Sequence, residues 1–279
     1  MTALSDWLDA CDYIGPAKNL RTYRAMGGSG GTPGSDRPRL IVIHTMEASE
    51  APGRARSTAQ WVKDSGGAAQ VSCHFTADDV EAIRCVADIH TAFTQLTPWN
   101  DMSLSIEQAG FAAQTLGDWM DPYSVGQRRI VARIVAAWCE KWAIPPVFLD
   151  AGDLVDWRNC TGITTHYQIS LASQRPELTS LGYKAGNHTD PGPNYPMDML
   201  IAEVKTLLGG STTEEPMIDY LGILPDGSVF ARGGGTARRV NGEEIAGVYA
   251  GLKVHQVPAG SNWEAWVAKE LAAYDRAVA

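Results

Sequence analysis

The sequence predicts an α/β (α+β) fold with a central mixed β-sheet flanked by helices, followed by a small C-terminal α+β module. Apolar strand-like runs alternate with amphipathic helical segments, which is typical of a sheet covered by helices. The run at residues 40–44 is apolar up to its last residue, as expected for a strand that is buried on both faces. Beyond residue 215 short strands and a final helical segment replace this pattern.

The elements of the N-terminal half follow from local patterns. An amphipathic piece carries Leu4, Trp7 and Leu8, and a glycine-rich loop follows at 27–34. Residues 54–63 have helical periodicity and are expected to stop at the glycine pair 66–67. Two acidic residues at 78–79 favour a hairpin turn. Strands are expected at four places, namely 39–44, 71–76, 81–86 and 103–107.

The strongest helical pattern begins at Ser124, where Gln127 three residues later completes a capping box. The prolines at 145–146 are expected to end this helix. A second helix follows Pro196 and ends at the glycine pair 209–210.

The chain is expected to divide into two parts. The first spans residues 1–210 and includes an N-terminal extension over 1–38, and the polar stretch 209–215 is suited to a linker. Residues 216–279 form the small module, with a turn at 225–227 and a second capping box at Ser261 before a final helix. A unit of this size has a marginal core, so we expect docking or self-association into a homo-oligomer through it.

Composition excludes several classes of partner. The formal net charge of −9 argues against nucleic acid, because phosphate binding needs clustered basic residues. No apolar run approaches the ~20 residues that cross a bilayer, so no membrane partner is expected. An odd number of cysteines without framework spacing suits a reducing cytoplasm. The N-terminus lacks a basic segment before an apolar run, so we expect no signal peptide.

Three segments bring together residue types that bind zinc. Asp190 lies in a stretch that is stiffened by two prolines around a glycine, while His44 and His166 each end an apolar run. Two imidazoles and one carboxylate from separate segments form a catalytic zinc set with the fourth position left open. Taken singly, each residue has an equally good reading as a hydrogen-bonded core or loop residue.

Five segments in order carry a resemblance to a known family. They are IVIHT at 41–45, VSCHF at 71–75, SIE at 105–107, GITTH at 162–166 and TDPGP at 189–193. Their order resembles that of the type-2 N-acetylmuramoyl-L-alanine amidases, which share their fold with the peptidoglycan-recognition proteins. The similarity covers roughly residues 38–208. The chain looks like the bacteriophage endolysin branch, because it carries an appended module and no visible signal peptide.

The resemblance implies a role for each matching residue in the metal centre. His44, His166 and Asp190 would bind Zn²⁺, and Glu107 would be the general base. Glu107 can also be read as a solvated strand residue, and Glu47 is a competing carboxylate.

Other implied roles concern the substrate. Many relatives have a lysine where this chain has His188, whose imidazole can stabilise a developing oxyanion although its charge depends on pH near neutrality. His90, Trp99 and Asn100 are expected beside the substrate groove, and each has a plain packing or loop interpretation as well.

The implied activity is hydrolysis of the amide between N-acetylmuramic acid and L-alanine in peptidoglycan, which lyses the bacterial cell wall. Two alternatives stay open at this point, a recognition module that binds peptidoglycan without cutting it and a stem-peptide peptidase on the same scaffold. The protein is expected in the host cytoplasm after synthesis and on the wall after release. The C-terminal module is expected to bind the wall or to mediate dimerisation.

Overall fold

The computed structural model describes residues 4–15, 37–69, 71–95 and 98–209. Further along the chain it describes the backbone of four strands within 218–256. The glycine-rich loop, the linker and the final helix expected from the sequence lie outside the described residues.

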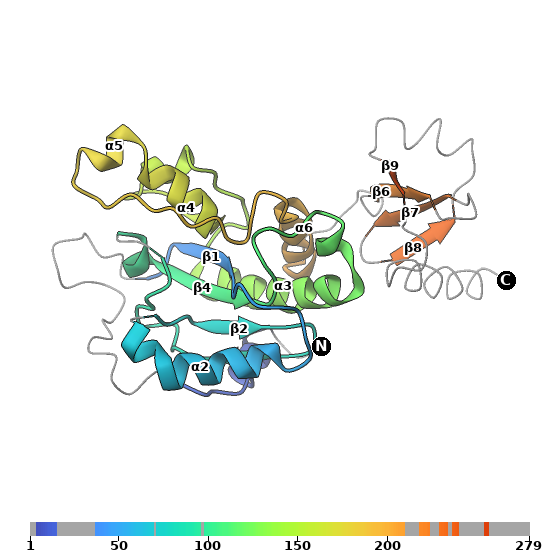
Figure 1. Cartoon of the computed structure of the whole chain (residues 1–279), viewed down its shortest axis with the longest axis horizontal. Helices are drawn as coiled ribbons and strands as arrows, with labels where there is room; N and C mark the ends of the chain where they lie inside the picture. The colour runs from blue at the N-terminus through green and yellow to red at the C-terminus, as the bar shows by residue number, and fades with distance from the viewer. Residues whose placement is uncertain are drawn as a thin grey trace.

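A mixed five-stranded sheet forms the centre of residues 37–209 (Figure 1). Its strands are β1 (Leu40–Thr45), β2 (Phe75–Ala77), β3 (Ala82–Arg84), β4 (Ser103–Gln108) and β5 (Gly162–Thr165). Their order is β3-β2-β4-β1-β5, and β3 alone among them runs antiparallel to its neighbour. The predicted mixed sheet is therefore confirmed, with the apolar run at 40–44 in an interior strand.

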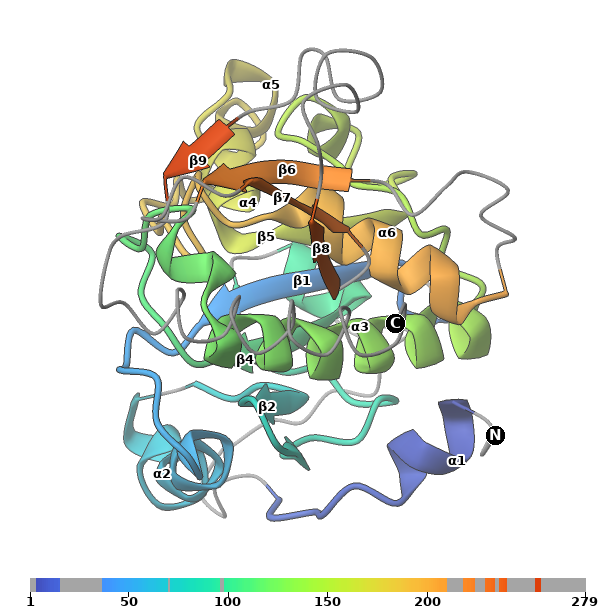
Figure 2. The same ribbon diagram turned by 90° about the vertical axis from the view of Figure 1, so that its right-hand side faces the viewer.

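The helices cover the sheet on both sides and at its edges. They are α1 (Leu4–Asp9), α2 (Arg54–Ala69), α3 (Pro122–Trp142), α4 (His166–Ser173), α5 (Pro176–Thr179) and α6 (Met197–Leu207), with short 3₁₀ turns η1 (Trp99–Met102), η2 (Asp118–Met120) and η3 (Asp153–Val155). Figure 2 shows α3 and α6 side by side along one face of the sheet. Helix α2 packs beside β2 and β3, while α4 packs beside β5 and β1.

Successive side chains along the strands point to opposite faces of the sheet, and this divides the core into two clusters. Ile41, Ile43, Leu104 and Ile106 face α3 and α6 in the larger cluster, which also holds Trp138. Leu40 and Val42 point to the opposite face and pack with a second cluster that includes Trp99, Trp157 and Ile169 of α4. Since strand residues alternate between faces, the even-numbered residues of β1, including His44, lie on the α4 side of the sheet.

Two details of the helices differ from the sequence prediction. Asp121 caps α3, since its side chain accepts a hydrogen bond from the backbone N–H of Ser124 at 2.8 Å. Gln127 instead donates to the backbone carbonyl of Ala109 at 2.8 Å, so the predicted capping box is wrong. Helix α2 continues to Ala69, through the glycine pair that was expected to end it, because glycine weakens a helix without preventing one.

The C-terminal strands form a sheet of their own. The described strands are β6 (Ile218–Ile223), β7 (Val229–Gly233), β8 (Thr236–Arg239) and β9 (Val254–Gln256), in the order β8-β7-β6-β9. β6 and β7 are antiparallel, as the sequence predicted for the two strands beside the turn at 225–227. Among the helices described, none has both the length and the apolar character needed to cross a membrane.

Candidate metal centre

Strand register places three of the predicted site residues in one row. Residue pairing between the parallel strands β1 and β4 sets His44 beside Glu107. On the other side of β1, Ile43 pairs with Thr165, and His166 follows directly as the first residue of α4. Because parallel strands in register direct paired side chains to the same face, these residues meet at the carboxyl ends of the strands, where α/β sheets bind ligands.

Asp190 reaches this row from a loop that α4 holds in place. The backbone N–H of Tyr167 donates to the carbonyl of Asp190 at 2.8 Å. Further along α4, the hydroxyls of Ser170 and Ser173 accept from the backbone N–H groups of His188 and Gly186, at 3.0 and 2.8 Å. The polar side of α4 therefore fixes the loop whose rigidity the sequence suggested.

The close approach of a second loop also requires glycine after Asp190. Gly192 has φ +92°, and a Cβ atom there would lie 2.0 Å from the carbonyl oxygen of Ala112. Only glycine combines that backbone conformation with that contact.

The carboxylate of Asp190 binds both histidines directly. Its Oδ2 lies 3.0 Å from Nδ1 of His44, and its Oδ1 lies 3.2 Å from Nδ1 of His166. The two imidazole rings are 4.6 Å apart between centroids. All three residues are buried, and one potential ligand atom from each lies within 4.8 Å of the others.

Charge is distributed unevenly over these three groups. Burial raises the pKa of Asp190, but the hydrogen bonds from His166 and His44 outweigh burial and hold that pKa well below its usual range. Burial lowers the pKa of His166 to about 4. Burial also lowers the pKa of His44, yet its hydrogen bond to Asp190 and the charge of Glu107 leave it raised. The cluster thus holds an anionic carboxylate and a neutral imidazole, the forms that bind metals.

The three residues fit a zinc ion. Two imidazoles and one carboxylate are a usual catalytic zinc set, and ligand bonds of 2.0–2.2 Å in tetrahedral geometry separate donor atoms by ~3.3 Å. The measured separations of 3.0 and 3.2 Å from Asp190 to the two histidines are close to that value. In addition, Nε2 of His166 is buried without a hydrogen-bond partner among the described residues.

Glu107 lies at the edge of the cluster with one carboxylate oxygen unused. Its Oε1 is 4.0 Å from Nδ1 of His44, and 20% of its side chain remains exposed. Its Oε2 is buried and has no hydrogen-bond partner within the described part of the chain. Burial raises the pKa of Glu107 to about 7. A carboxyl group of this kind can hold or release a proton near neutral pH.

Glu47, the competing carboxylate, forms hydrogen bonds that join two parts of the backbone. Its Oε1 accepts from the hydroxyl of Thr45 at 2.7 Å and from the backbone N–H of Ala112 at 2.8 Å. The side chain therefore ties the end of β1 to the loop that contacts Gly192.

The other predicted site residues lie in different surroundings from one another. His188 is 56% exposed, stacks on His166 with ring centroids 4.1 Å apart, and places its Nδ1 3.7 Å from Oδ1 of Asp190. Trp99 is fully buried in the core beneath β1, so the expectation that its indole lines a groove is wrong. The side-chain oxygen of Asn100 accepts hydrogen bonds from the backbone N–H groups of Thr94 and Gln95.

His90 is half-buried in the described structure. Its carbonyl oxygen lies 2.9 Å from Nε2 of His74. Substrate contact by His90 and Asn100 stays a prediction.

Sequence reasoning missed one residue that touches the cluster. Gln95, which is 6% exposed, places its Oε1 3.2 Å from Nε2 of His44. Its amide nitrogen bonds to the hydroxyl of Ser103. The alternation of β4 indicated that Ser103 and Glu107 share a face, but no local pattern marked a glutamine in a loop.

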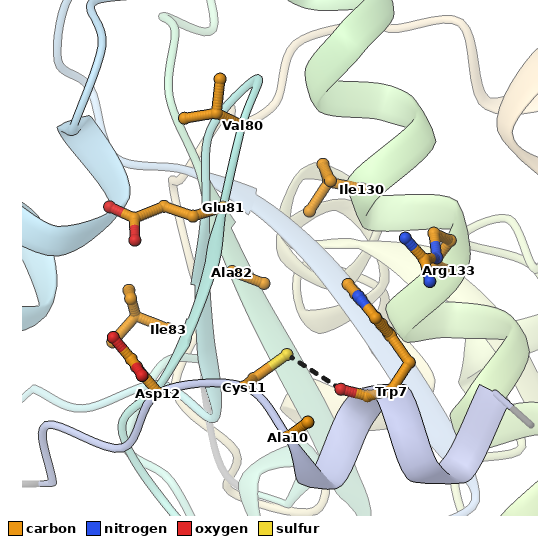
Figure 3. A pocket seen from close by; sticks show the side chains of 10 residues that line it. All are labelled: Trp7, Ala10, Cys11, Asp12, Val80, Glu81, Ala82, Ile83, Ile130 and Arg133. Atoms are coloured by element: carbon orange, nitrogen blue, oxygen red, sulfur yellow. Dashed lines mark hydrogen bonds between the residues drawn. The ribbon is translucent and has the colours of Figure 1, made fainter. Parts of the chain in front are cut away.

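A separate cavity lies away from the cluster. Figure 3 shows it between α1, the β2–β3 hairpin and α3, with Trp7, Cys11, Glu81 and Arg133 among its lining residues. Its volume is about 260 Å³, and it shares no residue with the cluster around Asp190. The guanidinium of Arg133 lies 4.1 Å from the centre of the Trp7 ring. The contact secures α1 against α3 on the other side of the sheet.

Comparisons with known proteins identify the family of the chain. Residues 34–193 match the family model described as N-acetylmuramoyl-L-alanine amidase. No curated protein matches the chain.

Three solved structures with a similar fold are matched over most of their own length. They are the Staphylococcus aureus hydrolase AmiA with its ligand (13% identity, 75% of this chain, 94% of that chain, TM-score 0.48), a selenomethionine derivative of AmpD (16%, 73%, 97%, 0.43) and a mutant endolysin from Bacillus subtilis (13%, 70%, 97%, 0.44). These scores are too low for the solved structures to bear on substrate or mechanism.

Proposed function

Since the chain belongs to the N-acetylmuramoyl-L-alanine amidase family, it is an enzyme that hydrolyses an amide of peptidoglycan, and we propose that it does so with one zinc ion held by His44, His166 and Asp190. The bond cut is the amide between the lactyl group of N-acetylmuramic acid and L-alanine. The observation that carries the proposal is the convergence of three distant side chains, with potential ligand atoms within 4.8 Å of one another, beside an unpaired carboxylate oxygen.

Each of the three residues would contribute one donor atom. A bound zinc ion supplies Lewis acidity, which polarises a carbonyl and acidifies water. Asp190 contributes the negative charge, and α4 holds its loop so that both carboxylate oxygens face the histidines. Burial keeps His166 neutral and therefore able to donate its lone pair.

Glu107 is the proposed general base. Its position beside His44 in the strand register places the carboxyl group next to the metal ligands without making it one of them. The unpaired Oε2 can accept a proton from an attacking water. Because burial raises its pKa to about 7, the same group can then return the proton to the leaving amine.

His188 is proposed to stabilise the oxygen of the scissile carbonyl as it gains charge. It is the most exposed histidine of the cluster, and its ring is stacked nearly parallel on His166, with 18° between the planes. This stacking limits the rotation of the ring, which is exposed beside the cluster. A donor in that place lowers the energy of a developing oxyanion.

The decisive experiment is digestion of purified cell walls followed by mass spectrometry of the released fragments. An amidase frees intact stem peptides from the glycan, and we expect those products to disappear after chelation and to return with Zn²⁺. Fragments cut within the stem peptide would instead assign a peptidase. Binding of walls without any released fragment would assign a recognition module.

We also propose that the protein is a bacteriophage endolysin that is made in the host cytoplasm and acts on the wall after release. The C-terminal module over residues 216–279 would hold the enzyme on the wall. Cosedimentation with purified walls compares the full chain with a chain ending at residue 209. Equal retention of the two forms would contradict a wall-binding role. A monomeric mass for the full chain in sedimentation equilibrium would contradict self-association through the module.

A further inference from the structure

A chain of hydrogen bonds leads from the metal cluster into the core on the α4 side of the sheet. Nε2 of His44, the nitrogen that faces away from Asp190, lies 3.2 Å from Oε1 of Gln95. The amide nitrogen of Gln95 bonds to the hydroxyl oxygen of Ser103. That hydroxyl donates in turn to the backbone carbonyl of Trp99 at 2.6 Å.

The far end of this chain determines the direction of every bond in it. A backbone carbonyl can only accept, so the proton of the Ser103 hydroxyl must point to Trp99. The oxygen of Ser103 then has only lone pairs to offer Gln95, which must present its NH₂ group there. The carbonyl oxygen of Gln95 is left facing His44, and it requires an N–H at Nε2.

We propose that Gln95 is a positioning residue that holds a proton on Nε2 of His44, so that Nδ1, which faces Asp190 and His166, is the nitrogen that binds the metal. This inference rests on the proposed function, because the choice of nitrogen matters only if His44 binds the metal. A histidine ligand whose other nitrogen is held in this way has its ring orientation set before the metal arrives.

Gln95 is itself held firmly enough to act in this way. Its backbone N–H donates to the side-chain oxygen of Asn100 at 3.0 Å, and its own side chain is buried. The preceding residue, Thr94, donates through its hydroxyl to Ser105 at 2.8 Å. Ser105 and Ser103 lie on the same face of β4 as Glu107. The loop is thus fastened to the strand that carries the proposed base.

The first test measures Zn²⁺ affinity of the full chain by competition with a chromophoric chelator. We expect Gln95→Leu to weaken zinc binding about 10- to 100-fold, the usual cost of losing such an outer partner. Gln95→Glu keeps an acceptor at the same place and should recover most of that loss. Gln127→Leu removes another buried glutamine that contacts Gln108 and Ala109, and it should leave zinc affinity unchanged.

The second test reads the Nε2 proton of His44 directly in zinc-loaded protein. In ¹⁵N-labelled wild type we expect an Nε2–H signal that exchanges slowly with solvent, because Gln95 accepts its hydrogen bond. In Gln95→Leu we expect that signal to exchange faster. Ser103→Ala, which leaves the acceptor in place, provides a milder variant if Gln95→Leu does not fold.

The outcomes separate the two proposals. If wild type binds zinc and Gln95→Leu binds it equally well with an unchanged exchange rate at Nε2 of His44, the positioning role is wrong while the metal site stands. If wild type itself binds no zinc, the proposed function fails.

Discussion

The two faces of the same three strands, β1, β4 and β5, have different compositions and different tasks. Toward α3 and α6 they present Ile41, Ile43, Leu104 and Ile106, all fully buried in apolar contact. Toward α4 the register places polar groups in line, with Val42 beside Ser105 and His44 beside Glu107. One face is therefore apolar along its length, while the other passes from the apolar cluster at Leu40 and Val42 to the hydrogen-bonded groups around His44.

The comparison shows how a buried site can be polar without weakening the sheet beneath it. Burying an unpaired polar group costs free energy, and the side chains of His44, Gln95 and Ser105 on the α4 side all have partners. Among the described residues, the buried atoms without a partner include Oε2 of Glu107 and Nε2 of His166 in the cluster and the indole nitrogens of Trp99 and Trp157 in the core. The first two lie at the proposed metal site.

The largest effect is expected for Glu107→Gln on the polar face. The amide has the shape of the carboxyl group but cannot accept the proton, so turnover on purified walls should fall by about 10²- to 10⁴-fold. Zinc binding should persist, because Glu107 is not one of the three proposed ligands. Full turnover in this variant would show that the proton goes elsewhere.

Ile134→Ala on the apolar face should lower the stability of the protein and leave its activity unchanged. Ile134 of α3 is fully buried in the larger cluster, and its truncation should lower the free energy of unfolding by about 2–5 kcal/mol. Turnover and zinc affinity per folded molecule should stay at the wild-type level. Chemical denaturation with chelated protein measures the first quantity, and a reduced zinc affinity at full folding would mean that the faces are coupled.

A smaller effect is expected for His188→Ala at the rim of the cluster. Removal of a buried oxyanion donor costs about 10²- to 10³-fold in turnover, and an exposed donor should contribute less. We expect a loss of about 10-fold in kcat with KM and zinc content nearly unchanged. His188→Lys should recover activity. A drop in zinc content instead would place His188 among the ligands.

The smallest effect concerns the stability of the metal-free protein with pH. Burial raises the pKa of Glu107 from 4.5 to about 7 in the folded protein. The folded state therefore binds this proton more tightly than the unfolded chain, so the stabilisation is complete below pH 4.5 and is lost as pH rises through 7.

Glu107→Gln removes this dependence. Relative to wild type, its melting temperature should rise between pH 4.5 and 8 by several °C, since one pKa unit corresponds to ~1.4 kcal/mol and ~1 kcal/mol moves the melting temperature by about 2–4 °C in a chain of this size. Thermal melts in chelator across that range measure it. A constant difference at all pH values would contradict a raised pKa for Glu107.

The sequence was sufficient to predict the strands and helices that have a clear local pattern of apolar and polar residues. The apolar run at 40–44, the alternation at 103–107 and the helices after Asp121 and Pro196 are in the structure near their predicted bounds. The three cluster residues were also identified from sequence, because each ends an apolar run or lies in a rigid turn.

The remaining features depend on tertiary contacts that no local pattern encodes. Gln95 is a loop residue whose partners, His44 and Ser103, come from two other strands. Trp99 resembled a groove aromatic in sequence, but η1 turns its ring into the core. Helix α4 was missed because it is short and begins directly at His166, so a proposed metal ligand also serves as the start of the helix.

The most direct test of the metal centre is the stoichiometry of zinc in purified protein, measured by titration calorimetry of the full chain and of Asp190→Ala. We expect wild type to bind one Zn²⁺ per chain and Asp190→Ala to bind none at micromolar concentration, with its fold intact by circular dichroism. If Asp190→Ala bound one equivalent as tightly as wild type, His44, His166 and Asp190 would not be the residues that hold the metal.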